Sequence, residues 1–150
     1  MERYDSEKAA RVWQRVRGEG EMPLSGLPGM AAAEQTMAES LRQLQRQNPQ
    51  MAAEDLVRES IANAAVLRGM AKLLGQTAEV TASVPQPKEM PENCLRRCYA
   101  AALQMLNAYE RYADHPEYGP VFRELAHRKR QHCFRIPELL GRQSGQKARR

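Results

Sequence analysis

The chain has few aromatic residues, no long apolar run and no cysteine framework. Aromatic side chains make up 5% of its 150 residues, with a single tryptophan. No stretch approaches the roughly 18 consecutive apolar residues that a transmembrane helix needs, and its three cysteines lack the number and spacing of a disulfide framework. No secretory signal peptide is recognisable. We therefore expect a protein of the reducing cytoplasm that does not span a membrane.

The apolar residues that are present favour helices. They make up 42% of the chain and are mainly alanine, leucine, methionine and valine. Alanine and leucine are strong helix formers, and β-branched residues, which favour strands, are scarce. A chain of this length fits one domain, whose core can bury roughly two-thirds of the unfolded surface. We expect an all-α fold, in which Tyr99 and Tyr109 share an inward stripe.

Apolar residues recur at helical spacing in five segments. A short N-terminal helix is predicted over residues 5–17, and four longer helices over 30–47, 51–74, 94–113 and 121–136. The four longer helices are sufficient for an antiparallel four-helix bundle, onto which the short extra helix should pack.

The connections between the four long helices differ in length. Only a few residues around Asn48-Pro49 separate the first two, so these helices should be antiparallel neighbours. The proline-rich stretch 77–93 predicts an extended crossover, and residues 115–120 predict a turn before the last helix. Proline lacks the N–H that a helix interior needs, so Pro137 should stop or kink that helix. The resulting order is hairpin, long crossover, hairpin.

The chain divides into three parts by composition. Residues 1–29 hold the short helix and a Gly/Pro-rich linker, residues 30–141 the bundle, and residues 142–150 a basic tail expected to be disordered. From Tyr118 onward nine Lys/Arg stand against two acidic residues, whereas the preceding part has fourteen Lys/Arg and sixteen acids. Such a basic end can attract an anionic partner. No aromatic residues alternate with the basic ones in the tail, which argues against nucleic acid.

Several polar residues lie on stripes that should face the core, although polar residues of an amphipathic helix belong outside. There is one on the first long helix, two on the second and two on the fourth: Glu34, Ser60, Asn63, Lys129 and His132. Burying an unpaired charge costs several kcal/mol, so these residues must pair, reach solvent or bind something. We expect a buried polar cluster in which Glu34 bonds to Lys129, His132 or Asn63.

Distances from the turns predict which of these residues lie at the same depth. Helices rise about 1.5 Å per residue, so residues equally far from a turn lie side by side. Glu34 and Asn63 are each about fourteen residues from the first turn and should face each other. For His132, the same reasoning gives Cys98 and Ala102 of the third long helix as the nearest inward residues.

This layout resembles the ferritin-like proteins of the rubrerythrin type. The helix order matches, as do the inward polar pairs three residues apart on the second and fourth long helices. The run CYAAALQMLNAYERYADHPEYGPVFRELAHRKRQHC, from Cys98 to Cys133, is similar to small bacterial ferritin-like sequences. The resemblance covers about residues 30–140. In such bundles a Glu on each of two helices and a Glu-x-x-His on each of the others hold two irons.

Carried over position by position, most of those ligands are missing. Glu34 and His132 match ligand positions, and Glu59 lies one residue from another. An oxygen-rich iron site needs several carboxylates, and the ammonium of Lys129 would repel a cation. The resemblance thus implies at most an incomplete iron or manganese site, with Glu34, Glu59 and His132 as its ligands. The ligand positions that carry other residues are Ser60, Asn63, Cys98, Ala102 and Lys129.

Two other groupings contain metal-binding residue types. Glu110 and the Glu-x-x-His segment Glu124–His127 could form a small site, but surface Glu/His pairs are common and this face should point outward. Cys98, His132 and Cys133 could form a soft-metal site or an activated thiol. Free buried cysteine is more often a small hydrophobe, which is the interpretation we favour.

Three functions are compatible with these patterns. The first is a ferritin-like bundle that has lost di-iron chemistry and acts without a cofactor as a structural or interaction protein, as a homodimer or with another protein. The second is an iron- or manganese-dependent oxidoreductase. The third is a module that binds an anionic partner through the basic C-terminal region. The ligand count favours the first.

Overall fold

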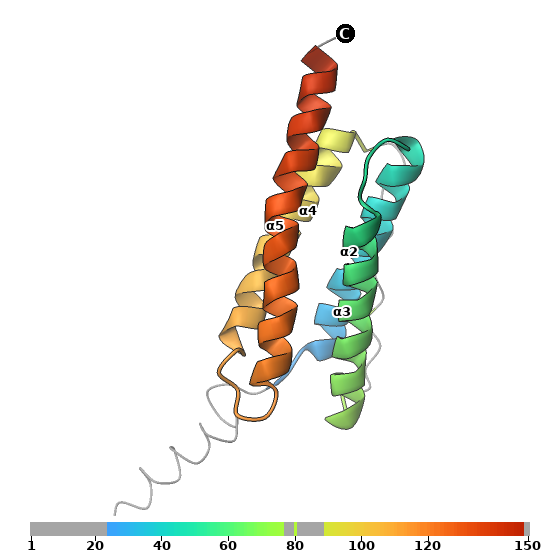
Figure 1. Cartoon of the computed structure of the whole chain (residues 1–150). Helices are drawn as coiled ribbons and strands as arrows, with labels where there is room; N and C mark the ends of the chain where they lie inside the picture. The colour runs from blue at the N-terminus through green and yellow to red at the C-terminus, as the bar shows by residue number, and fades with distance from the viewer. Residues whose placement is uncertain (1–23, 77–79, 81–88, 149–150) are drawn as a thin grey trace, which may run out of the picture.

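The computed structural model of the protein describes residues 24–76, 80 and 89–148. These residues form four helices and no strand: α2 (Leu27–Gln47), α3 (Glu54–Leu73), α4 (Pro91–Arg111) and α5 (Gly119–Ala148) (Figure 1). The prediction of an all-α fold with four long helices is confirmed. The helix expected over residues 5–17, with Trp13, lies outside the described residues. None of the four described helices is both long and apolar enough to span a membrane.

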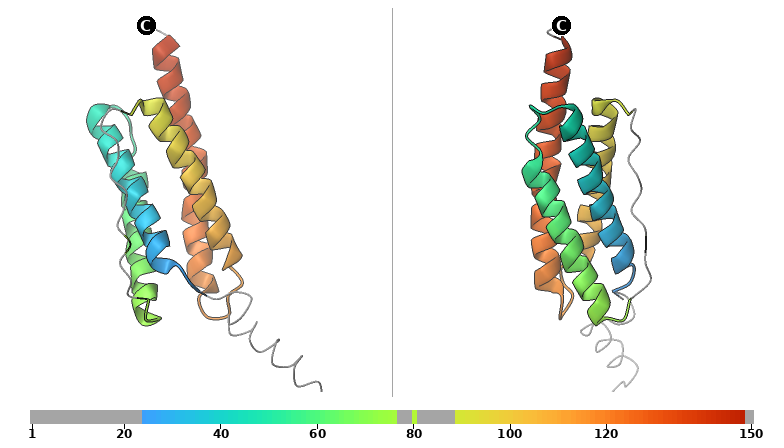
Figure 2. Two further views of the ribbon diagram at one scale, coloured as in Figure 1. Left: turned by 180° about the vertical axis from the view of Figure 1, so that it is seen from behind. Right: turned by 90° about the vertical axis from the view of Figure 1, so that its right-hand side faces the viewer.

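The helices associate as two hairpins. α2 packs along α3 and runs in the opposite direction, and α4 packs along α5 in the same way (Figures 1 and 2). The two hairpins meet through α2 against α4 and, over a shorter contact, α3 against α5. Each helix therefore has two neighbours, and the inner faces of all four point to one core.

The core is aliphatic through most of its length and aromatic at one end. Burial of a leucine side chain contributes roughly 2 kcal/mol, so the aliphatic layers supply most of the packing energy. At the α4–α5 turn the rings of Tyr109 and Tyr112 pack on Phe122, with centroid separations of 6.3 and 5.1 Å. The leucine and isoleucine residues that are at most 1% exposed are Leu27, Leu41, Leu56, Leu67, Leu95, Leu125 and Ile136.

Two of the predicted helix starts are three residues too late. α2 begins at Leu27, inside the segment predicted as a linker, because that side chain is completely buried and Pro28 suits a first helical turn. Gln76 holds this start by accepting from the Leu27 amide at 3.2 Å and donating to the Leu24 carbonyl. α4 begins at Pro91, which was assigned to the crossover.

The last helix is much longer than predicted. α5 continues through Pro137 to Ala148, so residues 142–148 are helical rather than a disordered tail. Proline removes one backbone hydrogen bond, but Ile136 before it is fully buried and Leu139 after it is 2% exposed. Burial on both sides of the proline outweighs the missing bond. In Figure 1 the C-terminal end of α5 projects beyond the neighbouring helix ends.

The inward stripe of α4 is shifted slightly from the predicted one. Cys98, Ala102 and Tyr109 are buried as expected, but Tyr99 is 37% exposed and Cys94 takes the inward position instead. The shift amounts to a small rotation of the helix, since Cys94 and Cys98 are one turn apart on the same stripe.

Candidate functional site

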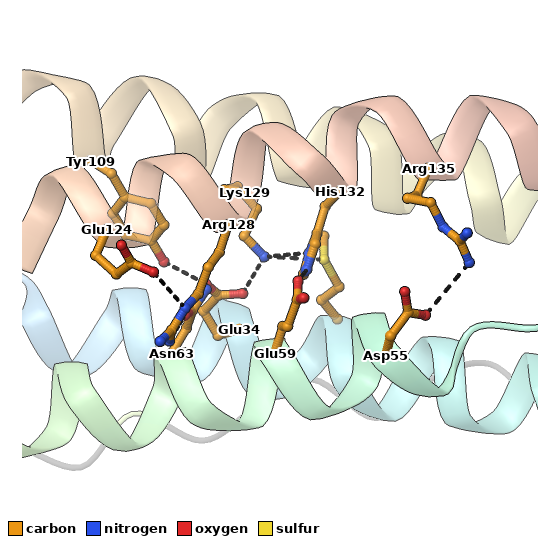
Figure 3. A network of polar contacts seen from close by, with 11 residues as sticks. Glu34, Asp55, Glu59, Asn63, Tyr109, Glu124, Arg128, Lys129, His132 and Arg135 are labelled. Atoms are coloured by element: carbon orange, nitrogen blue, oxygen red, sulfur yellow. Dashed lines mark hydrogen bonds and ion pairs between the residues drawn. The ribbon is translucent and has the colours of Figure 1, made fainter.

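The five polar residues expected inside the bundle are all inside it. Glu34, Ser60, Asn63, Lys129 and His132 each have 0% relative exposure. The predicted helical phase is therefore correct for α2, α3 and α5. Four of the five form one hydrogen-bonded network across the centre of the bundle (Figure 3).

The ammonium of Lys129 is the centre of this network. Its Nζ lies 2.5 Å from Glu34 Oε1, 3.1 Å from His132 Nδ1 and 3.6 Å from Met37 Sδ. An ammonium has three N–H donors and no acceptor. A carboxylate, an imidazole and a thioether thus use the full donor capacity of Lys129, which satisfies a charge that would otherwise be costly to bury.

Both oxygens of the Glu34 carboxylate also have hydrogen-bond donors. Its second oxygen, Oε2, accepts hydrogen bonds from Asn63 Nδ2 and from the Tyr109 hydroxyl, both at 2.8 Å. The contact with Asn63 is the one predicted from the depth of the two residues. Burial and the Glu34 carboxylate raise the pKa of Tyr109, which keeps its phenol protonated as a donor. The ion pair is therefore charge-balanced, and three helices contribute donors to Glu34.

His132 connects the ion pair to the protein surface. Because Lys129 can only donate, His132 Nδ1 must be the unprotonated acceptor, and the ring proton lies on Nε2. Nε2 is 2.7 Å from Glu59 Oε2, and the Glu59 side chain is 40% exposed. Burial and the Lys129 charge lower the pKa of His132 to about 3, so the ring is neutral at physiological pH. Burial raises the pKa of Glu59.

A second layer of contacts joins the network to solvent on the α3–α5 side. Arg128 donates to Asn63 Oδ1 at 3.1 Å and lies 3.4 Å from Glu124. Asn63 thus receives a hydrogen bond on its oxygen and donates one from its nitrogen, which fixes the orientation of its amide. Ser60, the fifth buried polar residue, has no hydrogen-bond partner for its hydroxyl among the described residues.

The third long helix contributes differently from the prediction. Cys98 and Ala102 are buried, as expected, but the Cys98 thiol pairs with the Cys94 thiol one turn away. This hydrogen bond lowers the pKa of Cys94, and the Cys94 sulfur lies 3.9 Å from the Ser40 carbonyl oxygen. The alternative grouping of Cys98, His132 and Cys133 is not held together by any contact in the described part of the chain.

The surface Glu-x-x-His motif is outside the core, as predicted. His127 is exposed, and Glu124 is 59% exposed and paired with Arg128. Glu110 is engaged by Arg130 at 3.0 Å. Each of these carboxylates is therefore neutralised by an arginine of α5 rather than directed at a shared metal position.

The three residues proposed as metal ligands are connected but do not converge. Lys129 lies between Glu34 and His132 and bonds to both, while Glu59 reaches only the far nitrogen of the imidazole. Within residues 24–76, 80 and 89–148, no three His, Cys, Asp or Glu side chains are grouped so that they could hold a metal ion. The position between Glu34 and His132 is occupied by an ammonium.

An open pocket lies at the α2–α3 turn, away from this network. It has a volume of about 700 Å³, and Arg42, Arg46 and Arg58 are among its lining residues, with Val57 also present. None of the network residues lines it. The buried ion pair therefore has no access to solvent through this pocket.

Three members of the network were not recognised from the sequence. Met37 and Tyr109 were expected to be ordinary core residues, and no role was predicted for Arg128. A buried tyrosine usually bonds through its hydroxyl, so Tyr109 could have been inferred as a partner for the buried carboxylate. No comparable signal exists for the Met37 sulfur.

Comparisons with known proteins do not assign the chain to a family. No protein-family model matches it, and neither a curated protein nor a solved structure is significantly similar to it.

Proposed function

We propose that the protein is a metal-independent helical bundle of ferritin-like layout, in which an internal ion pair takes the place of a metal centre, and that it acts as a structural or interaction protein. The observation that carries this proposal is the coordination of Lys129. Its ammonium is surrounded by the oxygen of Glu34, the nitrogen of His132 and the sulfur of Met37. These are the kinds of atoms that ligate a metal ion, but here they neutralise and solvate a covalently attached cation.

The ammonium also explains why catalysis through a metal is disfavoured. A divalent ion bound by Glu34 and His132 would lie next to a positive charge at the same depth, and both ligands would have to release Lys129. At an effective dielectric of 20, two unit charges at 4 Å interact by about 4 kcal/mol, and a divalent ion doubles that repulsion. Metal binding at this position therefore needs Lys129 to leave the core.

The enclosure of the network supports a structural role. Glu34, Lys129, His132 and Tyr109 each have 0% exposure, so no substrate can contact them without opening the bundle. A fully satisfied polar network holds its helices in one register, because a displaced helix would leave a buried charge unpaired. Here the network ties α2 to α3, α4 and α5 at one level.

The test is to exchange the internal cation for a ligand. Lys129→Glu restores the Glu-x-x-His spacing with His132 and places a third carboxylate beside Glu34 and Glu59. We expect the wild-type melting temperature to be unaffected by Fe²⁺, Mn²⁺ or Zn²⁺, and that of Lys129→Glu to rise when one of these ions is added, because only the variant has ligands without the ammonium.

Lys129→Gln is the matched control. It removes the positive charge without adding a carboxylate, so its response to metal should be clearly smaller than that of Lys129→Glu. A wild-type protein that is stabilised by stoichiometric metal, as strongly as Lys129→Glu, would contradict the proposed function and favour the metal-dependent oxidoreductase.

A further inference from the structure

We propose that the outward face of α3 is a homodimer interface, through which two copies of the chain pack their α3 helices antiparallel about a two-fold axis. This inference rests on the interaction role proposed above and names the partner as a second copy. We call this surface the outer face of α3. It consists of Ile61, Ala62, Ala65, Val66, Gly69 and Leu73.

The outer face of α3 is unusually apolar for a helix surface. Ile61 is 37% exposed, Val66 36% and Leu73 79%, and the alanines and the glycine between them are also exposed. On α2, in contrast, no large hydrophobic side chain is exposed. In the right-hand view of Figure 2, α3 crosses the front of the bundle with no other helix in front of it. Grouped exposed apolar side chains of this kind mark interaction surfaces.

Charges at the two ends of α3 make a second copy the best occupant of this face. Glu54 lies in the first turn and Lys72 in the last. The two residues are eighteen positions apart, which corresponds to about five full turns, so the two side chains project from the same flank of the helix. A two-fold axis perpendicular to α3, near Asn63 and Ala64, sets Glu54 against Lys72 of the partner subunit, and the symmetry repeats the pair.

An axis half a residue further along, between Asn63 and Ala64, keeps Glu54 and the partner's Lys72 within side-chain reach and makes the middle of the face self-complementary. It sets Ala62 against Ala65 of the partner subunit, so the two helices can approach closely where the side chains are smallest. It also sets Arg58 against Gly69 of the partner subunit, a long side chain above a position with none. An isologous interface requires that a surface match itself in this way, whereas the binding of a different protein does not require it.

Gly69 has no packing reason within one copy of the chain. A Cβ built at this position meets no atom within 4 Å, and glycine weakens a helix interior relative to alanine. Close approach of another backbone is a common physical reason for a glycine at such a site.

Neither Lys72 nor Arg68 forms an ion pair within the described part of the chain, so Lys72 is available to a second copy.

The test uses two charge-reversal variants, each of which should weaken the dimer by itself and which should dimerise with each other when mixed. In Glu54→Lys both ends of α3 are basic, and in Lys72→Glu both are acidic, so each variant faces like charges across the two-fold axis. Analytical ultracentrifugation of the full chain should show a concentration-dependent dimer for wild type and a dissociation constant at least about tenfold higher for each variant. Mixing the two variants should restore wild-type affinity, because a mixed dimer again pairs opposite charges at both ends.

Arg96→Glu, on the exposed side of α4, is the control for a charge reversal away from this face and should leave the dimer unchanged. A second pair of variants tests the apolar residues of the outer face of α3. Leu73→Ser should weaken the dimer, whereas the control Phe134→Ser, at a similarly exposed position of α5, should not. A wild-type chain that is monomeric at the highest concentration measured, or variants that do not rescue each other on mixing, would overturn the proposal. These outcomes are independent of metal content, so failure here is distinguishable from failure of the proposed function.

Discussion

The ammonium of Lys129 lies 2.5 Å from Oε1 of Glu34, and neither side chain has any exposed surface. The two residues are 95 positions apart in the chain and come from different hairpins of the bundle. Breaking a buried pair by removing one partner is costly, because the remaining charge stays in the core without compensation. Replacing both partners together can be nearly neutral. The pair thus links the two hairpins through an interaction that is sensitive to single substitutions.

This difference gives a double-mutant prediction. Glu34→Gln should lower the free energy of unfolding by about 3 kcal/mol, and Lys129→Met by a similar amount. The double variant should lose clearly less than the sum of the two, since no unpaired charge remains. Urea unfolding of the four proteins measures the coupling. A loss under about 0.5 kcal/mol for Glu34→Gln would mean that Lys129 reaches water instead.

The neutral imidazole predicts an acid-sensitive core. The pKa of His132 is lowered to about 3 in the fold, against an ordinary value of 6.5. Between these values the unfolded chain binds the extra proton, so stability is fully present above pH 6.5 and decreases as the pH falls toward 3. The expected loss from pH 7 to pH 4 is on the order of 3 kcal/mol. The pKa of Glu59 is raised in the fold, so protonation of this carboxyl stabilises the folded state as the pH falls and offsets part of the loss caused by His132.

Two histidine variants separate this effect from general acid denaturation. His132→Asn keeps an acceptor for Lys129 but cannot titrate, so its unfolding free energy should depend less on pH between 7 and 4. The matched change at the exposed His127 should leave the wild-type dependence intact. If both variants show the wild-type slope in pH-dependent chemical unfolding, His132 is not the titrating group.

The proline inside α5 gives a prediction about the longer helix. Pro137→Ala restores a backbone N–H donor and removes the ring, and should raise the free energy of unfolding by about 1–3 kcal/mol. Pro137→Gly also restores the donor, but glycine is a weak helix former, so its gain should be smaller by about 1 kcal/mol. Thermal unfolding followed by circular dichroism measures both. A neutral or destabilising Pro137→Ala would mean that α5 is interrupted at this residue.

The fold and most of the polar network follow from helical periodicity. A period of 3.6 residues placed Glu34, Asn63, Lys129 and His132 inside, because each lies on an otherwise apolar stripe. The short α2–α3 turn fixed the relative depth of Glu34 and Asn63, which are hydrogen-bonded in the structure. The depth rule was sufficient for the pair that faces across the short α2–α3 turn.

Features that depend on contacts between distant segments were not predictable in this way. The rule that proline ends a helix is local, whereas the burial of Ile136 and Leu139 depends on the neighbouring helices. The long crossover gives no depth relation between the hairpins, so the pairing of Tyr109 with Glu34 was missed. The depth rule at the α4–α5 turn named Cys98 and Ala102 as the inward neighbours of His132, but it could not show that the hydrogen bonds of His132 go to Lys129 on its own helix and to Glu59 of α3.

The metal content of natively purified protein tests the central claim most directly. Elemental analysis of the wild-type chain, set beside the Glu34→Ala/His132→Ala double variant, should show no stoichiometric metal in either. Iron or manganese near one equivalent per chain in the wild type, lost in the double variant, would contradict the assignment of Lys129 as the internal cation.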